Sequence, residues 1–265
     1  MALAFWKSGG GEAAPIVFMH GLLRNRHCFA PLFPAVMARR EIFSVDQAGH
    51  GESARLDAYR VVDHLPGLIS FLENEVARPA VLYGHSMGAM LAAAIAAARP
   101  ELVQGAVMED PPFHTMGWRL PGSALGEYFA AIRPHLGTGI RWTELAKVPV
   151  GERTVGQLRD ATQLRFMARC LAAAAPDMLD VVVAGKWLDG YDQERVWQGL
   201  RCPALLLQAD PAAGGMLTVD DAAAIVRAGS DVALVRLPDG VGHQAHWQDS
   251  AAVTRHLLAF LESLD

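Results

Sequence analysis

The sequence predicts an α/β protein built on a mostly parallel, twisted sheet of about seven strands flanked by helices. Short apolar runs alternate along the chain with stretches that repeat hydrophobic residues at helical spacing, which is typical of parallel strands joined by crossover helices. Most of these runs are continuously apolar instead of alternating with polar residues. That pattern indicates strands that are covered by helices on both faces.

The predicted elements follow one another regularly up to residue 110 and again after residue 199. The predicted strands are apolar runs bounded by turn residues: Pro15–Met19, Ile42–Val45, Ala80–Tyr83, Ala106–Met108, Ala204–Gln208 and Val232–Leu237. One added strand, roughly Ala2–Lys7, fits before the first of them. The predicted helices repeat apolar residues every three or four positions: Val61–Val76, Ala89–Ala98 and Ala251–Leu264.

Residues 111–199 break this rhythm. The segment is rich in Trp, Phe, Met and Arg; its one strand-like run is Val181–Val183, and Leu158–Ala174 has helical spacing. An excursion of this length is too long for a loop in a compact domain. We therefore predict a core domain made of residues 1–110 and 200–265, with a helical lid at residues 111–199.

Composition excludes several classes of function. The net charge of −5 leaves no basic surface for nucleic acid. Three cysteines without a C-x-x-C pair argue against a disulfide framework or a zinc site and indicate buried or neutral thiols. No apolar run approaches the roughly 18–20 residues that span a bilayer, and the N-terminus lacks the features of a signal peptide. We expect a cytoplasmic protein without a membrane partner, either a monomer or a homodimer.

A candidate nucleophile lies between a predicted strand and a predicted helix. Residues 84–88 read Gly-His-Ser-Met-Gly and match G-x-S-x-G directly after the apolar run that ends at Tyr83. Such a strand–turn–helix elbow holds its serine in strained backbone angles, and glycine at positions 84 and 88 lets neighbouring backbone pass closely. Ser86 is the predicted nucleophile.

A second motif, His20-Gly21-Leu22-Leu23, ends the first strong strand. With the Ser86 motif it resembles the α/β-hydrolase family, and the resemblance covers nearly the whole chain. The resemblance implies that the backbone N–H groups of Leu22 and Met87 form an oxyanion hole for a tetrahedral intermediate. His20 is expected to shape this turn and is also a candidate for contact with the substrate.

Residues 46–53, Asp-Gln-Ala-Gly-His-Gly-Glu-Ser, are similar to the family's D-x-R-G-x-G-x-S loop. Ala48 stands where arginine is usual, which removes a structural cation near the loop. His50 fills a variable position and is interpreted as a loop histidine.

The resemblance implies that an acid and a histidine follow downstream and complete a catalytic triad. His243 lies between the strand at 232–237 and the last helix, the family's usual place for the general base, with His246 as its competitor. Asp210, after the strand at 204–208, is the first candidate for the acid. Asp110, after the strand at 106–108, is the alternative.

These residues predict a serine hydrolase of the carboxylic ester type that works without a cofactor or a metal. Its substrate is expected to be a small-to-medium ester, lactone or related acyl compound with an apolar acyl group. Candidate substrate contacts are aromatic residues of the lid: Phe113, Trp118, Trp142 and Trp187. Three alternatives stay open: a hydrolase that cleaves a C–C bond in vinylogous diketones, a cofactor-free oxygenase or lyase, and a hydrolase-like receptor for a small molecule.

Overall fold

The computed structural model describes residues 2–117 and 120–265. Its centre is a seven-stranded sheet of order β1-β3-β2-β4-β5-β8-β9. The strands are β1 (Phe5–Ser8), β2 (Ile16–Met19), β3 (Ile42–Val45), β4 (Ala80–His85), β5 (Val103–Glu109), β8 (Ala204–Gln208) and β9 (Val232–Arg236). Neighbouring strands are parallel, except that β1 pairs with β3 in the antiparallel sense. The predicted α/β class and strand number are confirmed.

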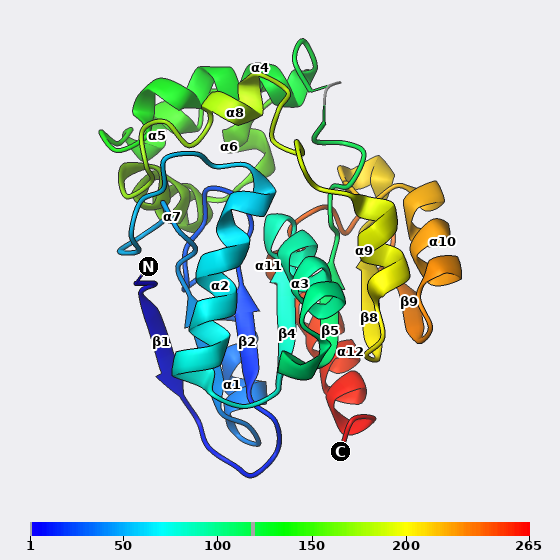
Figure 1. Ribbon diagram of the computed structural model, residues 1–265. Coiled ribbons are helices and arrows are strands. Elements are labelled where there is room, and N and C mark those ends of the chain that lie inside the picture. The colour runs from blue at the N-terminus through cyan, green and yellow to red at the C-terminus, as the bar shows by residue number, and fades with distance from the viewer. Residues whose placement is uncertain (1, 118–119) are drawn as a thin grey trace.

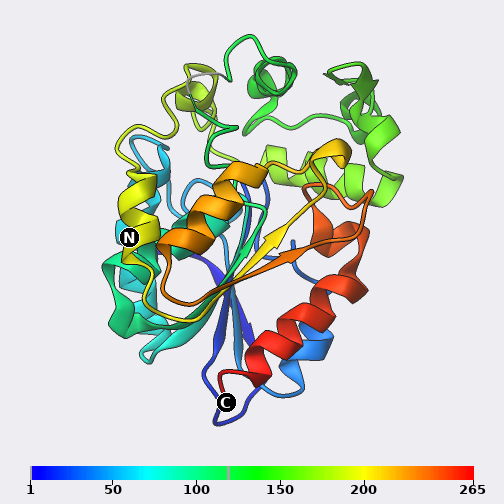
Figure 2. The same ribbon diagram turned by 90° about the vertical axis from the view of Figure 1, so that its right-hand side faces the viewer.

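Helices cover both faces of the sheet (Figures 1 and 2). One face carries α2 (Leu65–Phe71), α3 (Met87–Ala98), α9 (Gln193–Gly199) and α10 (Val219–Ala228). The other carries α1 (Phe33–Met37) and α12 (Ser250–Glu262), with the short α11 (Ala245–Gln248) before α12. Every residue of β2 and β4 is buried because helices lie on both sides, which explains the continuously apolar runs.

Short helical turns join these elements. They are η1 (Val61–His64), the π-helical η2 (Leu72–Val76), η3 (Pro100–Leu102), η4 (Arg133–His135) and η5 (Pro211–Ala213). The predicted helix at 61–76 is therefore one continuous helical stretch made of η1, α2 and η2, with its single α-helical part in the middle.

Residues 111–199 form helices between β5 and β8, with one small hairpin. The elements are α4 (Ala124–Ile132), α5 (Trp142–Leu145), β6 (Pro149–Val150), β7 (Arg153–Thr154), α6 (Val155–Leu158), α7 (Ala161–Ala172), α8 (Asp180–Val183) and α9. The helices α4 to α8 lie above the carboxyl ends of the strands (Figure 1), whereas α9 packs beside the sheet against α3. The last helix of the predicted lid is thus part of the layer that flanks the sheet.

The strand-like run Val181–Val183 is helical, not extended. It lies in α8, where the Val183 amide donates to the carbonyl of Leu179 at 2.9 Å. A three-residue apolar run is compatible with either state, and here local i to i−4 bonds form.

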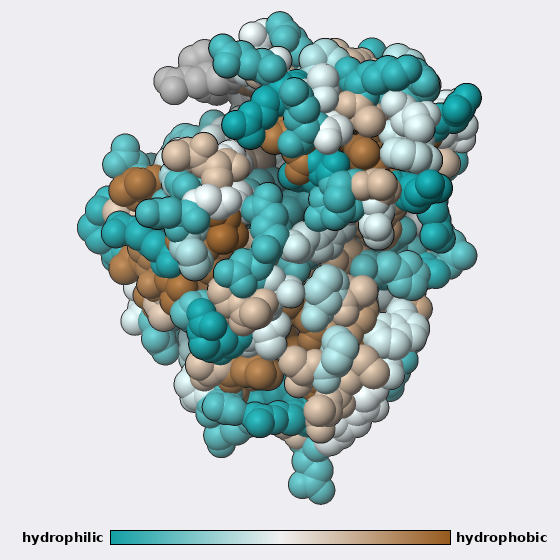
Figure 3. Space-filling view, turned by 180° about the vertical axis from the view of Figure 1, so that it is seen from behind, coloured by the Kyte–Doolittle hydropathy of each residue, from teal (hydrophilic) through white to brown (hydrophobic). Residues whose placement is uncertain are grey.

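The surface mixes hydrophilic and hydrophobic side chains, as the view from behind shows (Figure 3). Among the described residues the large hydrophobic side chains that are exposed are Val219 and Val226, both on α10. No helix within the described ranges combines the length and the apolar character needed to cross a membrane.

Candidate active site

Ser86 occupies the sharp turn between β4 and α3. Its backbone angles are φ +54° and ψ −118°, a conformation that L-residues other than glycine rarely adopt. The turn closes because its two glycines lack a side chain. A Cβ on Gly84 would lie 2.1 Å from the carbonyl oxygen of Gly88, and a Cβ on Gly88 would lie 1.9 Å from that of Met19. The predicted elbow is present, and it places Ser86 against a cavity.

A hydrogen-bonded triad runs from Ser86 through His243 to Asp110. The Oγ of Ser86 is 3.0 Å from Nε2 of His243, and Nδ1 of His243 is 2.6 Å from Oδ2 of Asp110. The Asp110 carboxylate is fully buried and also accepts the N–H groups of Met216 at 2.7 Å and Leu217 at 3.1 Å. These backbone donors hold the carboxylate in one orientation toward the imidazole.

Asp210, the first candidate for the acid, does not contact His243, so that choice was wrong. Its two carboxylate oxygens accept the N–H groups of Ala212 at 2.9 Å and Gly240 at 2.8 Å. Asp210 therefore joins the turn after β8 to the loop that leads to His243. Asp110 is the partner of His243 because the N–H groups of Met216 and Leu217 orient its carboxylate, whereas the carboxylate of Asp210 is taken up by its own turn and by Gly240.

The two amides assigned to the oxyanion hole belong to Met87, which directly follows Ser86, and to Leu22 in the turn after β2. Met87 is the first residue of α3, where backbone N–H groups are unsatisfied by the helix itself. Leu22 follows Gly21, and a Cβ on Gly21 would lie 3.0 Å from Cβ of Ser86. Within the described part of the chain neither amide has a hydrogen-bond acceptor. Both N–H groups are therefore available to an oxyanion, and this role stays a prediction.

Two buried histidines hold the turn that carries Leu22. The amide of Leu23 donates to Nε2 of His50 at 3.1 Å, and the amide of Gln47 donates to Nε2 of His20 at 3.1 Å. Each Nδ1 donates to a nearby carbonyl, so each ring accepts at one nitrogen and is neutral. His20 is fully buried and does not line the cavity. These hydrogen bonds agree with the predicted role of His20 in the turn. Because its side chain does not line the cavity, the structure does not support its predicted contact with substrate.

Arg26 supplies a cation to the loop that has Ala48 in place of arginine. Its guanidinium pairs with Asp46 at 2.5 Å and reaches Glu52 as well. The loop thus retains a positive partner, which comes from a different position of the chain.

The buried histidines predict a loss of stability in mild acid. Burial is the main reason that the pKa values of His20 and His64 are lowered to about 4. The negative charges of Asp46, near His20, and of Asp63, near His64, raise these pKa values but do not offset the effect of burial. Unfolded histidine has a pKa of about 6.5, so between about pH 6.5 and pH 4 the unfolded chain binds more protons. The free energy of unfolding therefore falls as pH drops through this range, by about 2 kcal/mol for each histidine at pH 5. We expect a lower thermal midpoint at pH 5 than at pH 7 by circular dichroism.

His64 provides the matched variant for this pH dependence. Neither of its ring nitrogens has a hydrogen-bond partner among the described residues, so His64→Leu removes the titrating group without removing a bond. The variant should lose its share of the pH dependence, whereas His27→Gln, at an exposed position, should keep all of it. An unchanged pH dependence in His64→Leu would refute the assignment.

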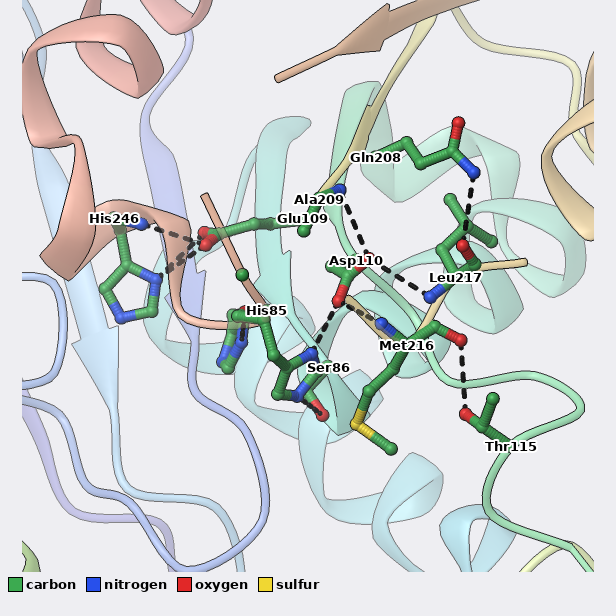
Figure 4. A network of polar contacts seen from close by, with 12 residues as sticks. His85, Ser86, Glu109, Asp110, Thr115, Gln208, Ala209, Met216, Leu217 and His246 are labelled. Carbon is green, nitrogen blue, oxygen red and sulfur yellow. Dashed lines mark hydrogen bonds and ion pairs between the residues drawn. The ribbon is translucent and has the colours of Figure 1, made fainter. Parts of the chain in front are cut away.

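A second buried network lies beside the triad and centres on Glu109 (Figure 4). The fully buried carboxylate accepts the hydroxyl of Tyr83 at 2.6 Å, the backbone N–H of His246 at 3.0 Å and Nδ1–H of His246 at 2.8 Å. Side chains alternate along a strand, so consecutive residues at the end of β5 face opposite ways: Glu109 toward this network and Asp110 toward His243.

His246, the competitor for the catalytic base, belongs to this network and is fully buried. Its Nε2 is 3.2 Å from Sγ of Cys28, a thiol whose pKa burial raises to about 12. The neighbouring His85 donates from Nε2 to the carbonyl of His243 at 2.7 Å, which links the network to the triad. The ligand atoms of His85, Glu109 and His246 lie within 4.8 Å of one another. Because both Glu109 oxygens and Nδ1 of His246 already form hydrogen bonds, we interpret the group as structural, not as a metal centre.

A cavity of about 690 Å³ opens onto Ser86 and His243. Apolar side chains from residues 111–199 form much of its wall: Met116, Leu125, Phe129, Val150, Val155, Leu158 and Met167. The predicted aromatic contacts are not among them. Phe113 and Trp187 are fully buried, Trp142 stacks against Arg165, and Trp118 lies outside the described residues. Phe113 and Trp187 gain free energy by complete burial in the packing of the helical segment, and the aromatic residues that line the cavity are Tyr128 and Phe129 instead.

Polar residues of the cavity wall were missed from the sequence. They are Arg24, Tyr128, Arg153, Gln157, Arg159, Gln244 and Gln248. Arg24 directly follows the His20–Leu23 turn and Gln244 directly follows His243, and these adjacencies were the available signals. Tyr128, Arg153, Gln157 and Arg159 come from the segment 111–199, which only the fold brings to the site.

Comparisons with known proteins agree with this geometry. The profile of the Alpha/beta hydrolase family matches residues 16–256. A haloalkane dehalogenase of Bradyrhizobium diazoefficiens is 33% identical over 105 residues, which are 39% of this chain and only 34% of that protein. The (E)-2-((N-methylformamido)methylene)succinate hydrolase of Acinetobacter baylyi is 26% identical over 217 residues, 79% of this chain and 77% of that protein.

A solved structure extends the likeness to the complete fold. The enol-lactonase of Burkholderia xenovorans superimposes with a TM-score of 0.74 at 17% identity, covering 98% of this chain and 96% of that one. The family profile covers most of the chain, and the elbow, the triad geometry and the sheet order agree with it. The chain therefore belongs to the alpha/beta hydrolase family.

Proposed function

We propose that the protein is a serine hydrolase that cleaves a carboxylic ester, lactone or related acyl bond through an acyl-Ser86 intermediate. The hydrogen-bonded line from Asp110 through His243 to Ser86, at the wall of a cavity, is the observation that carries this proposal. A serine hydroxyl is a weak nucleophile until a neighbouring base takes its proton, and His243 lies at the distance that this transfer needs.

In the proposed reaction Oγ of Ser86 attacks the acyl carbon while Nε2 of His243 takes the hydroxyl proton. Asp110 accepts Nδ1–H of His243 and stabilises the imidazolium that forms. The amides of Leu22 and Met87 donate to the oxyanion of the tetrahedral intermediate. Collapse of the intermediate breaks the bond to the leaving group, which takes the proton from His243. A water molecule, activated by the same imidazole, then hydrolyses the acyl-serine and restores the hydroxyl.

The hydroxyl nucleophile favours acyl substrates over haloalkanes and epoxides. Attack of Ser86 on a saturated carbon would join the substrate to the protein by an ether, which has no carbonyl for water to attack. Attack on an acyl carbon leaves an ester, which the same histidine and oxyanion donors can hydrolyse. The similarity to a haloalkane dehalogenase covers only 39% of the chain, and we do not propose that activity for this protein.

The cavity supports a small-to-medium substrate with an apolar part. Its volume of about 690 Å³ falls within the range of small-molecule sites. The apolar side chains contributed by residues 111–199 suit an alkyl or alkenyl acyl group, and we propose that the helices α4 to α8 act as the lid over it. The Acinetobacter relative, named for hydrolysis of a substituted succinate, adds support for an acyl compound of this size.

Labelling with a fluorophosphonate probe tests the proposal. The probe should modify wild-type protein at Ser86, as mapped by mass spectrometry, and Ser86→Ala should stay unlabelled. Wild type should also release 4-nitrophenol from 4-nitrophenyl butyrate, and Ser86→Ala should not. Equal labelling of both proteins, or activity that survives in Ser86→Ala, would overturn the proposal; the latter result would favour proton abstraction by His243 without a covalent intermediate.

A further inference from the structure

The charged groups on the cavity wall are all of one sign. Three arginines line it, Arg24, Arg153 and Arg159, and no aspartate or glutamate is among the described residues that do. The whole chain, in contrast, has a net charge of −5. The positive wall is therefore a local feature of the site and not a consequence of composition.

Arg24 is the most unusual of these groups because its side chain is buried and has no carboxylate partner among the residues that the structure describes. The residue is only 8% exposed. Its guanidinium donates to the carbonyl of Leu23 at 2.9 Å and, in the amide orientation that satisfies both groups, to the side-chain oxygen of Gln244. Both acceptors are neutral. Buried charges in proteins are normally paired, so the position of Arg24 points to a negative group that arrives from outside the chain.

Arg159, which is half-buried, lines the same cavity from the helical segment. Its one hydrogen-bond acceptor among the described residues is the carbonyl of Leu158, at 2.8 Å. Burial first, and then the positive charge of Arg24, lower the pKa of Arg159 from its ordinary value. Arg24 and Arg159 also both act on the pKa of Tyr128, whose phenol is buried in the same wall. The three side chains line the same cavity, and the two guanidinium groups carry like charges that repel each other.

We propose that the substrate carries a carboxylate in addition to the acyl bond that is cleaved, and that Arg24 and Arg159 bind this carboxylate. Guanidinium groups match a carboxylate through two parallel N–H donors, and these charge-assisted bonds are strong where water is excluded. Arg153, which is exposed on the same wall, attracts the anion at the entrance. This inference rests on the proposed function, because the acyl bond must lie at Ser86 while the carboxylate is bound.

Paired ester substrates test the preference for a carboxylate. One pair is 4-nitrophenyl hydrogen adipate and 4-nitrophenyl heptanoate, which have acyl chains of similar length; the other is 4-acetoxybenzoate and its methyl ester, with the charge on the leaving group. For at least one pair we expect wild-type kcat/KM to be about tenfold to hundredfold higher for the anionic ester. Arg159→Gln and Arg24→Gln should remove most of this preference, because the ratio of kcat/KM for the two esters of a pair falls toward one.

The matched control is Arg169→Gln, an exposed arginine of α7 that does not line the cavity, which should keep the wild-type preference. Because Arg24 is buried, Arg24→Lys accompanies Arg24→Gln, and fluorophosphonate labelling of every variant shows that the elbow is intact. Wild type that is labelled but prefers neither anionic ester would overturn the inference and leave the proposed function standing. An unchanged preference in Arg159→Gln and in both Arg24 variants would also overturn it.

Binding to Ser86→Ala separates the anion site from catalysis. Adipate binding, followed by ligand-detected NMR, should be measurable in Ser86→Ala and at least tenfold weaker when Arg159→Gln is added. Adipate binding with these properties supports the carboxylate site itself, and the labelling experiment separately tests the acyl-enzyme on which the choice of substrate rests. Inorganic phosphate that binds as tightly as adipate would overturn the assignment to a carboxylate.

Discussion

Replacement of Asp110 by asparagine is expected to lower kcat by about 10⁴-fold on an ester substrate. In the structure Oδ2 of Asp110 accepts Nδ1–H of His243 at 2.6 Å, which leaves Nε2 free of hydrogen and able to accept the Ser86 proton. An asparagine amide that presents its NH₂ group to Nδ1 stabilises the opposite tautomer. Nε2 then carries hydrogen and cannot act as a base. Steady-state kinetics with 4-nitrophenyl butyrate measure the loss.

Asp210→Asn is the matched control for this prediction. Asp210 accepts the amides of Ala212 and Gly240, and an asparagine oxygen preserves one of these bonds. We expect a loss of less than about tenfold, caused by a looser loop before His243. A loss in Asp210→Asn as large as that in Asp110→Asn would contradict the assignment of the acid. Urea denaturation of both variants distinguishes a catalytic loss from unfolding.

Replacement of Glu109 by leucine is expected to lower the free energy of unfolding by about 3–5 kcal/mol. The change leaves the hydroxyl of Tyr83 and two N–H groups of His246 without an acceptor in a site that water does not reach. Each buried donor that loses its partner costs about 1–3 kcal/mol. Urea denaturation followed by tryptophan fluorescence measures the change.

Two further variants show whether the hydrogen bonds of Glu109 cause this loss. Glu109→Gln keeps an oxygen of the same shape and should lose less stability than Glu109→Leu. Glu101→Gln alters an exposed glutamate that pairs with Arg99 on the surface, and should leave the urea midpoint unchanged. A stable Glu109→Leu protein would show that the network is not needed for the fold.

The sequence determined those features that depend on neighbouring residues. The elbow could be predicted because Gly84 and Gly88 flank Ser86 within five residues, and the packing limits that require glycine act inside that turn. The strands could be predicted because burial on both faces leaves a continuous apolar run. His243 could be placed because it follows the last strand and precedes the last helix.

The partner of His243, in contrast, depended on contacts between distant segments. Asp110 and Asp210 both follow a parallel strand, so both lie at the same edge, and their local sequences do not distinguish them. Only the tertiary structure shows that the N–H groups of Met216 and Leu217 orient Asp110 toward His243, while Asp210 accepts the amide of Gly240.

The lining of the cavity was decided in the same way. Aromatic residues of the segment 111–199 were the natural candidates, yet Phe113 and Trp187 are buried in its packing. The wall instead includes both Arg24, from the turn after β2, and Arg159, which lies more than a hundred positions later in the chain. By itself the sequence determined the class of fold and the elbow that carries Ser86, and it placed His243 as the predicted base, because local sterics and burial specify these features. The carboxylate partner of His243 and the charge of the cavity wall were decided by the tertiary structure alone, because each depends on contacts between segments far apart in the chain.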